Sequence, residues 1–161
     1  MLCQHYQLCS VYHLTFQFTC GYNTPSETND NKRFMFKQTG CGGILTGRRG
    51  SIQTPDYPAA YKENLNCEWK IKVQEQYSVN IKKAVINLPP PTQLSCNKDV
   101  VLVREGTNSS GNLLLQLCGT KEYNNYNSEF NSLFITFQSD TINDGANYKG
   151  AIAEYNTGKI F

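Results

Sequence analysis

The chain has few histidines and lacks the common catalytic motifs, and these shortages exclude several classes of enzyme. Its only histidines are His5 and His13, eight residues apart, so it has no His-Glu-x-x-His zinc-protease motif. A Ser-His-Asp set cannot be assembled from residues beyond His13. Neither a Gly-x-Ser-x-Gly elbow nor a phosphate-binding loop occurs. We therefore predict that the chain is not an enzyme.

The chain also lacks a charge excess and a long hydrophobic run. Fifteen basic side chains stand against 13 acidic ones, and the formal charge of +2 gives no field that would attract nucleic acid or an anionic membrane. The longest apolar run, Val100–Val103, has four residues, whereas a bilayer span needs about 20. The opening MLCQHYQLCS has no basic or continuous apolar region of a signal peptide. We predict no nucleic-acid partner and no membrane span.

Cysteine, by contrast, is frequent, with seven in 161 residues. Cys41, Cys67, Cys96 and Cys118 do not form the Cys-x2-Cys pairs of a structural zinc site, so we predict disulfides. Four cysteines can be paired in three ways, and their spacing does not choose among them. The sequon Asn108-Ser-Ser lies in a Gly/Ser-rich turn, which predicts a glycan on Asn108. These features indicate an extracellular or cell-surface protein, and without a signal peptide the chain is expected to be a fragment of a longer precursor.

Short strands dominate the hydrophobic pattern. Three segments alternate between apolar and polar residues, so each is predicted to bury one face and expose the other: Trp69–Val73, Tyr77–Ile81 and Leu133–Phe137. Val100–Val103 and Leu113–Leu117 are more continuously apolar, as is typical of strands covered on both sides or packed near the centre of a sandwich. Turn-forming residues separate the runs, and no helical period is sustained. The sequence therefore predicts an all-β chain folded as an antiparallel sandwich or barrel.

A series of motifs resembles the CUB family. CGGILTGRRGSIQTPDYPAAYKENLNCEWKI, from Cys41 to Ile71, is similar to the opening of a CUB domain, with its Cys-Gly-Gly, Pro-x-Tyr-Pro and Cys-x-Trp-x-Ile elements. CNKDVVLVREG, LCG, LFITFQSD and ANYKGAIAEY follow in the family order, and the resemblance extends to about Asn156. Ala151 departs from it, because the family usually has an aromatic residue there. Core packing near Ala151 is therefore expected to differ.

The resemblance implies a fold and a disulfide pattern. The family fold is a jelly-roll-like antiparallel β-sandwich, for which we predict a domain over residues 37–158. Family disulfides join successive cysteines, which implies Cys41–Cys67 and Cys96–Cys118. Trp69 lies on the buried side of an alternating strand, so we expect it in the core rather than in contact with a ligand.

The resemblance also implies a function. CUB domains of cubilin-like receptors bind other proteins, so we expect an extracellular protein–protein interaction module within a larger secreted or cell-surface protein. The alternative is an accessory domain that positions a substrate or partner for a secreted protease, either a tolloid-like metalloprotease or a complement-type serine protease. The sequence does not identify the protein ligand.

Calcium is the cofactor that the resemblance raises. Many CUB domains hold Ca²⁺ with a glutamate eight residues before the aspartate of Cys-x-x-Asp, with that aspartate, and with a later aspartate and its loop. Asp99, Asp140 and Asn143 match the later positions, but Pro91 occupies the glutamate position and residues 77–98 contain no acidic side chain. Alternatively, the aspartates cap turns through backbone N–H groups. Because Ca²⁺ needs about six to eight oxygens, we predict no calcium cofactor or only very weak binding.

Residues 1–36 have two interpretations. An alternating run over Leu14–Cys20 predicts a strand, and QLC at Gln7–Cys9 recurs at Gln116–Cys118. The segment is either the tail of a preceding CUB repeat, which would make neighbouring repeats partners of this domain, or an unrelated segment or gene-prediction artefact.

The cysteines of this segment leave one thiol over. Cys3, Cys9 and Cys20 are an odd number, which in a secreted chain suggests pairing with something outside this sequence. A zinc site built from Cys3, His5, Cys9 and His13 fits no standard spacing, so we do not expect one.

Overall fold

The protein is described by a computed structural model over residues 36–38, 41–141 and 148–160. Within these ranges it consists of strands and loops, and no helix has the length and apolarity that a bilayer span requires. The strands are β1 (Phe36–Gln38), β2 (Gly42–Leu45), β3 (Arg49–Gln53), β4 (Asn66–Lys72), β5 (Tyr77–Asn87), β6 (Val100–Glu105), β7 (Leu113–Leu117), β8 (Thr120–Asn127), β9 (Ser132–Gln138) and β10 (Gly150–Lys159).

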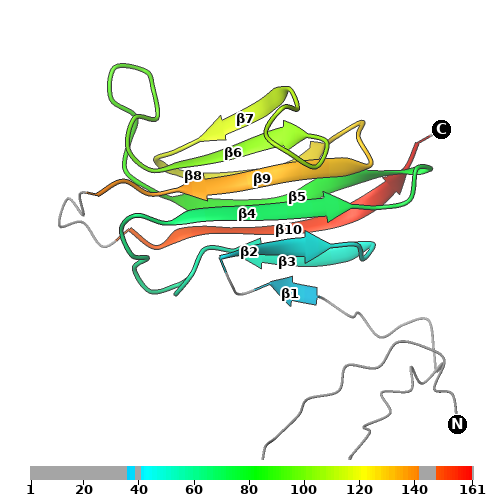
Figure 1. Cartoon of the computed structure of the whole chain (residues 1–161), viewed down its shortest axis with the longest axis horizontal. Helices are drawn as coiled ribbons and strands as arrows, with labels where there is room; N and C mark the ends of the chain where they lie inside the picture. Colours follow the sequence, from blue (N-terminus) through cyan, green and yellow to red (C-terminus); the bar gives the residue numbers. More distant parts are fainter. Residues whose placement is uncertain (1–35, 39–40, 142–147, 161) are drawn as a thin grey trace, which may run out of the picture. The chain divides into compact units, whose positions relative to one another are not determined.

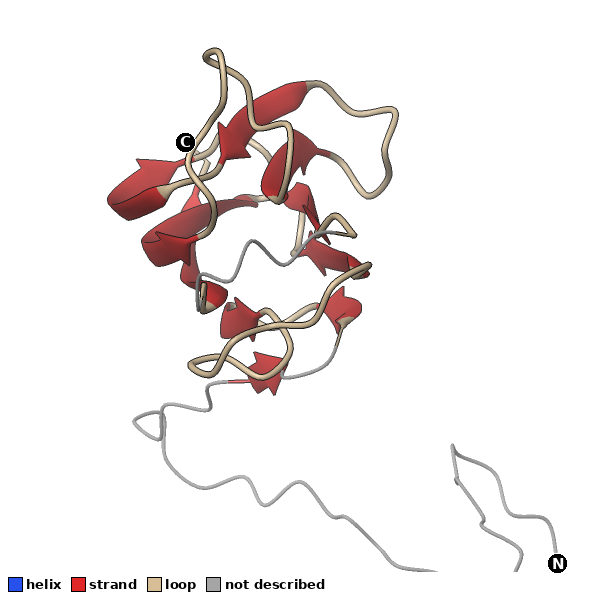
Figure 2. Ribbon diagram, turned by 90° about the vertical axis from the view of Figure 1, so that its left-hand side faces the viewer, coloured by secondary structure: helices blue, strands red, loops and turns tan. Residues whose placement is uncertain are grey.

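The strands form two five-stranded sheets. One has the order β1-β3-β10-β5-β8 and the other the order β2-β4-β9-β6-β7, and the end-on view of Figure 2 shows them as two layers. This arrangement confirms the predicted β-sandwich. Among the described strands, β1–β3 and β2–β4 pair in parallel and the other pairs are antiparallel. The two parallel pairs were not predicted.

The core lies between the two sheets, where the alternating strands place their apolar side chains. In β4, Trp69 and Ile71 are buried while Glu68 is exposed, as the alternation predicts. Trp69 is only 2% exposed, so the prediction that it belongs to the core is confirmed. Leu133 and Phe137 of the central strand β9 are fully buried against it.

Phe134 is an exception to the alternation in β9. It points away from the core side of Leu133 and Ile135, yet it is only 2% exposed. Its neighbours on the adjacent strands are Lys70 and Arg104, and Lys70 Nζ lies 5.9 Å from the ring centroid. Lys70 thus lies over the ring, and long side chains beside Phe134 account for its burial, so the prediction that this face is exposed is wrong at Phe134.

Two strands depart from the sequence prediction. β7 was predicted to be covered on both sides or to lie near the sandwich centre, but it is the last strand of its sheet and Leu113 is 46% exposed, so that prediction is wrong. β8 has the sequence TKEYNNYN, and its mostly exposed side chains gave no apolar signal. Its backbone pairs with β5 from Asn80–Asn127 to Asn87–Thr120. Backbone hydrogen bonding therefore builds this strand despite its polar composition.

Both implied disulfides are present, Cys41–Cys67 and Cys96–Cys118, with Cα–Cα distances of 4.6 and 5.8 Å. They select one of the three pairings that spacing left open. The first joins the segment before β2 to β4, and the second joins the loop before β6 to the end of β7.

The domain boundary of 37–158 stays a prediction. β1 begins at Phe36 and β10 ends at Lys159, one residue beyond each predicted limit. The predictions for residues 1–35, including their repeat, thiol and zinc interpretations, lie outside the described residues.

A pair of glycines tests the close packing at the start of β10. Gly150 and Gly106 both have positive φ, 89° and 80°. A Cβ on Gly150 would lie 2.0 Å from Thr54 Oγ1, whereas nothing lies within 4 Å of one on Gly106. Thr54 Oγ1 accepts a hydrogen bond of 3.0 Å from Ala151 N–H. A Cβ at position 150 that displaces Thr54 Oγ1 would therefore disrupt this buried hydrogen bond.

We expect Gly106→Ala to lower the free energy of unfolding by about 1–2 kcal/mol through backbone strain alone. Gly150→Ala should cost at least about 2 kcal/mol more, because the steric clash and the lost hydrogen bond add to that strain. Urea unfolding of the two variants measures the difference. Equal losses of unfolding free energy in the two variants would show that Gly150 is not packed against Thr54 as described.

Candidate binding surface at the loop end

Four connections lie at one end of the sandwich, which we call the loop end. They follow β3, β5, β7 and β9, and comprise residues 54–65, 88–99, 118–119 and 139–149, of which 142–147 are not described. Figure 2 faces this end and shows loops running across the ends of the strands. Loops held by a rigid scaffold are where binding residues concentrate, so the loop end is the first candidate surface.

Asp99 joins three of these loops. Tyr61 O–H donates a hydrogen bond to Asp99 Oδ2, and Asp140 N–H donates one of 2.8 Å to Asp99 Oδ1. The three residues come from three different loops. Asp99 is 6% exposed and Tyr61 is 9% exposed. A buried carboxylate that accepts two hydrogen bonds stabilises the loops it joins.

The Tyr61 phenol stays protonated in this setting. Burial raises the pKa of Tyr61 well above its ordinary value, and the hydrogen bond to Asp99 and the negative charges of Asp99 and Asp140 raise it further. Tyr61 is therefore a hydrogen-bond donor at every physiological pH.

Backbone hydrogen bonds connect the loops further. Asn64 N–H donates to Asp140 O over 2.9 Å, which joins the first and last loops of the set. Gly119 N–H donates to Pro89 O over 2.8 Å, which joins the other two. These bonds constrain the described parts of the four loops, and such constraint lowers the entropy lost on binding a partner.

A hairpin turn on the second loop exposes a leucine. Thr92 and Ser95 exchange two backbone hydrogen bonds of 2.9 and 3.0 Å, and Gln93 and Leu94 between them have φ of 51° and 68°. Such a turn normally requires Asn or Gly, because other side chains are strained there. Leu94 is fully exposed. In Figure 1 the light-green loop between β5 and β6 stands away from the sandwich.

The hairpin is braced at its base. Asn97 Nδ2 donates a hydrogen bond of 3.0 Å to Thr92 Oγ1, and the Cys96–Cys118 disulfide ties the loop to the end of β7. Leu94 is thus an apolar side chain presented on a constrained turn.

The proposed calcium ligands are only partly brought together. Asp99 and Asp140 are adjacent in space, and Asp99 Oδ1 accepts a hydrogen bond from the Asp140 backbone N–H, which joins two loops and does not cap a local turn. Pro91 is exposed and supplies no side-chain oxygen, and Asn143 lies outside the described residues. Among the described residues no three His, Cys, Asp or Glu side chains form a group able to hold a metal. Of the three proposed ligands, the described residues therefore bring together only Asp99 and Asp140.

The predicted glycosylation site lies at the opposite end. β6 starts and β7 ends at the loop end, so the turn between them, which contains Asn108, lies at the other end of the sandwich. Asn108 is exposed, and its Oδ1 accepts hydrogen bonds from Ser110 N–H over 2.9 Å and from Ser110 Oγ over 2.8 Å. A glycan on Asn108 would leave the loop end uncovered.

Comparison with known proteins identifies the family. The CUB domain family model matches residues 41–151, more than half of the chain. The chain belongs to the CUB family. Cubilin from Rattus norvegicus is 36% identical to this CUB domain over 110 residues, which cover 68% of the chain and 3% of cubilin. Tolloid-like protein 1 from Homo sapiens is 33% identical over 103 residues, 64% of the chain and 10% of that protein.

A solved structure shows the same fold. The MASP-1 CUB2 domain bound to Ca²⁺ superposes with a TM-score of 0.61 at 24% identity, covering 72% of this chain and 99% of that one. At this identity the likeness shows the fold alone. The CUB domain described here spans only a few per cent of the cubilin sequences it matches, so the functions of those whole proteins do not transfer to it directly.

Proposed function

We propose that this CUB domain is an extracellular protein-binding module of a larger secreted or cell-surface protein, and that it binds its partner through the loop end. The observation that carries the proposal is Leu94, a fully exposed apolar side chain on a strained and braced turn. Strain of this kind persists where the surrounding structure enforces it, and it is concentrated at functional sites. The partner that fits is a protein with an apolar pocket for the leucine and polar groups around it.

A pair of leucines tests this proposal. The immobilised full chain is incubated with extracellular fluid from its source organism, and the retained proteins are compared between wild type, Leu94→Glu and Leu113→Glu. Leu113 is also exposed but begins β7 at the opposite end, so it is the matched control. We expect Leu94→Glu to lose a partner that Leu113→Glu retains. Loss in both variants or in neither contradicts binding through the loop end.

The similarity to tolloid-like protein 1 supports a second candidate. In this case the domain positions a substrate or partner for a secreted protease and performs no chemistry of its own, since both histidines lie outside the CUB match. The genomic sequence on both sides discriminates the candidates. Further Cys-Gly-Gly repeats favour the receptor-like module, and an adjacent protease domain favours the accessory role.

The loop end is proposed to work without bound calcium. Both Asp99 oxygens accept hydrogen bonds from the protein, and a proline replaces the expected glutamate. Isothermal titration of the full chain with CaCl₂ should therefore give no saturable heat in the micromolar range, because ligand charge and number set Ca²⁺ affinity. A micromolar dissociation constant that is lost on Asp99→Ala or Asp140→Ala would contradict this.

Asn108 is proposed to carry an N-linked glycan. When the chain is secreted from eukaryotic cells, we expect a mass that peptide N-glycosidase removes. Ser110→Ala should abolish this mass because the third sequon position needs Ser or Thr, whereas Ser109→Ala should keep it. A wild-type chain whose mass the enzyme leaves unchanged would disprove the assignment.

A further inference from the structure

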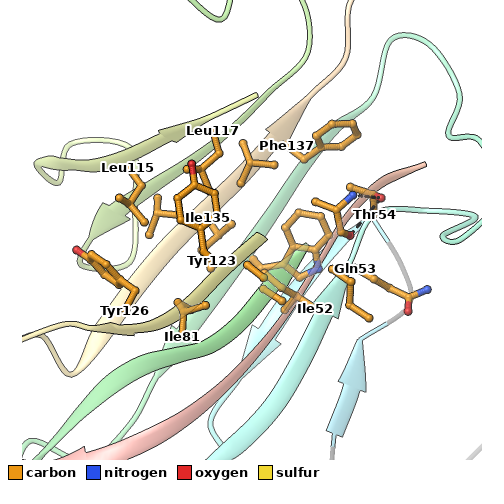
Figure 3. A pocket seen from close by; sticks show the side chains of 17 residues that line it. Ile52, Gln53, Thr54, Ile81, Leu115, Leu117, Tyr123, Tyr126, Ile135 and Phe137 are labelled. Carbon is orange, nitrogen blue, oxygen red and sulfur yellow. Dashed lines mark hydrogen bonds between the residues drawn. The ribbon is translucent and has the colours of Figure 1, made fainter. Parts of the chain in front are cut away.

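A cavity of about 40 Å³ lies between the two sheets. Its walls come from both layers, and the side chains around it are shown in Figure 3. Among them are Ala84 and Ala153 on one sheet and Trp69, Ile135, Val103 and Leu115 on the other.

The cavity originates in a pair of small residues. Ala153 of β10 pairs directly with Ala84 of β5. Their outer neighbours in the same row are large, Ile52 on β3 and Tyr123 on β8. Large residues at both ends hold the sheets apart, while the two alanines between them leave volume unfilled. Ala151, where the family usually has an aromatic residue, also lines the cavity.

The cavity reaches the open side of the sandwich. β7 and β8 are the last strands of their respective sheets. Leu115 on β7, and Tyr123 and Tyr126 on β8, line the cavity and are only partly buried. Figure 3 shows these three side chains on one side of the cavity, with Ile52 on the other. The edge between β7 and β8 is therefore the side of the cavity nearest to solvent.

The chemistry of the walls disfavours water. A buried water needs about two to four polar partners. Trp69 Nε1 is buried and has no hydrogen-bond partner among the described residues. The Thr54 hydroxyl is already bonded to Ala151, and the Gln53 amide donates to Tyr57 O. Most of the other lining side chains are apolar, so the cavity suits an apolar guest better than a water.

We propose that this cavity is a binding site for a small apolar molecule or a short alkyl group, which enters between β7 and β8. Its volume of about 40 Å³ exceeds the roughly 10–15 Å³ that one water needs and falls short of the roughly 150 Å³ of a cavity that holds benzene. A short aliphatic group fits this range, and an aromatic ring does not. The site lies between the sheets, shares only Thr54 with the loop end, and does not depend on the function proposed for the loop end.

Methane is the probe for this site, because its size matches a cavity that holds about one methyl group. The chain has one tryptophan, so the indole N–H of Trp69 gives a single resolved cross-peak in a ¹H–¹⁵N spectrum of the full chain. Increasing methane pressure should shift this peak saturably. Ala84→Val fills the cavity and should abolish the shift, whereas Ala60→Val, an exposed site on a loop, should leave it unchanged.

Ala153→Val is the second variant, because it fills the same space from β10 if Ala84→Val disturbs folding. A saturable shift that either folded filling variant removes supports the site. No shift in the wild type, or an equal shift in a folded filling variant, overturns the proposal.

Discussion

Replacing Trp69 by alanine is expected to lower the free energy of unfolding by about 3–5 kcal/mol, as for other large aromatic residues deleted from cores. Trp69 is 2% exposed and lies between the sheets with Ile71 and Phe137. Its removal would enlarge the cavity that already borders it. Urea unfolding followed by far-UV circular dichroism measures the loss without needing tryptophan fluorescence.

The control is Trp69→Phe, which keeps an aromatic ring in the core. Trp69 Nε1 has no hydrogen-bond partner among the described residues, so the substitution also removes a buried donor whose desolvation costs about 1–3 kcal/mol. We expect Trp69→Phe to be much less destabilising than Trp69→Ala. If Trp69→Ala costs less than about 1 kcal/mol, far below the usual loss for a core aromatic residue, Trp69 is not part of the core.

Removing either disulfide is the second large effect. Cys41 and Cys67 are 26 residues apart and Cys96 and Cys118 are 22 apart. Cross-links that close loops of this length are each worth about 3 kcal/mol in the chain-entropy model. The double variants Cys41→Ala/Cys67→Ala and Cys96→Ala/Cys118→Ala should therefore lose similar amounts of stability, since loop length enters only logarithmically.

Double variants are needed because a single replacement leaves a free thiol that can mispair. The measurement is urea unfolding of oxidised protein, with peptide mapping of the remaining bridge as the control. Wild-type stability in either double variant, or a crossed linkage in the wild type, would contradict the disulfide assignment and with it the placement of the strands.

Local sequence patterns predicted the strands that have one apolar face and one polar face. The period of two in Trp69–Val73 and Leu133–Phe137 predicted β4 and β9, because one face of each packs against the other sheet. The polar strand β8 gave no such signal, because it forms by backbone pairing with β5 at a sheet edge. The leucines of β7 predicted a doubly covered strand, since sequence alone does not show which strand is last in its sheet.

The candidate site was predicted only in part. Family motifs pointed to Asp99 and Asp140, but Tyr61, the donor to Asp99, is 38 residues away in the sequence. The exposure of Leu94 depends on a turn whose φ values its residue types do not favour. Long-range contacts and strained turns are set by the whole fold, so local sequence patterns do not reveal them.

Amide hydrogen exchange of the full chain, with and without the retained partner, tests most directly whether this CUB domain binds a protein through its loop end. We expect protection of residues 57–61 and 88–99 in the complex, with unchanged exchange at 73–76 and 106–112 at the opposite end. Protection confined to 73–76 and 106–112, with the loop end unchanged, would contradict it.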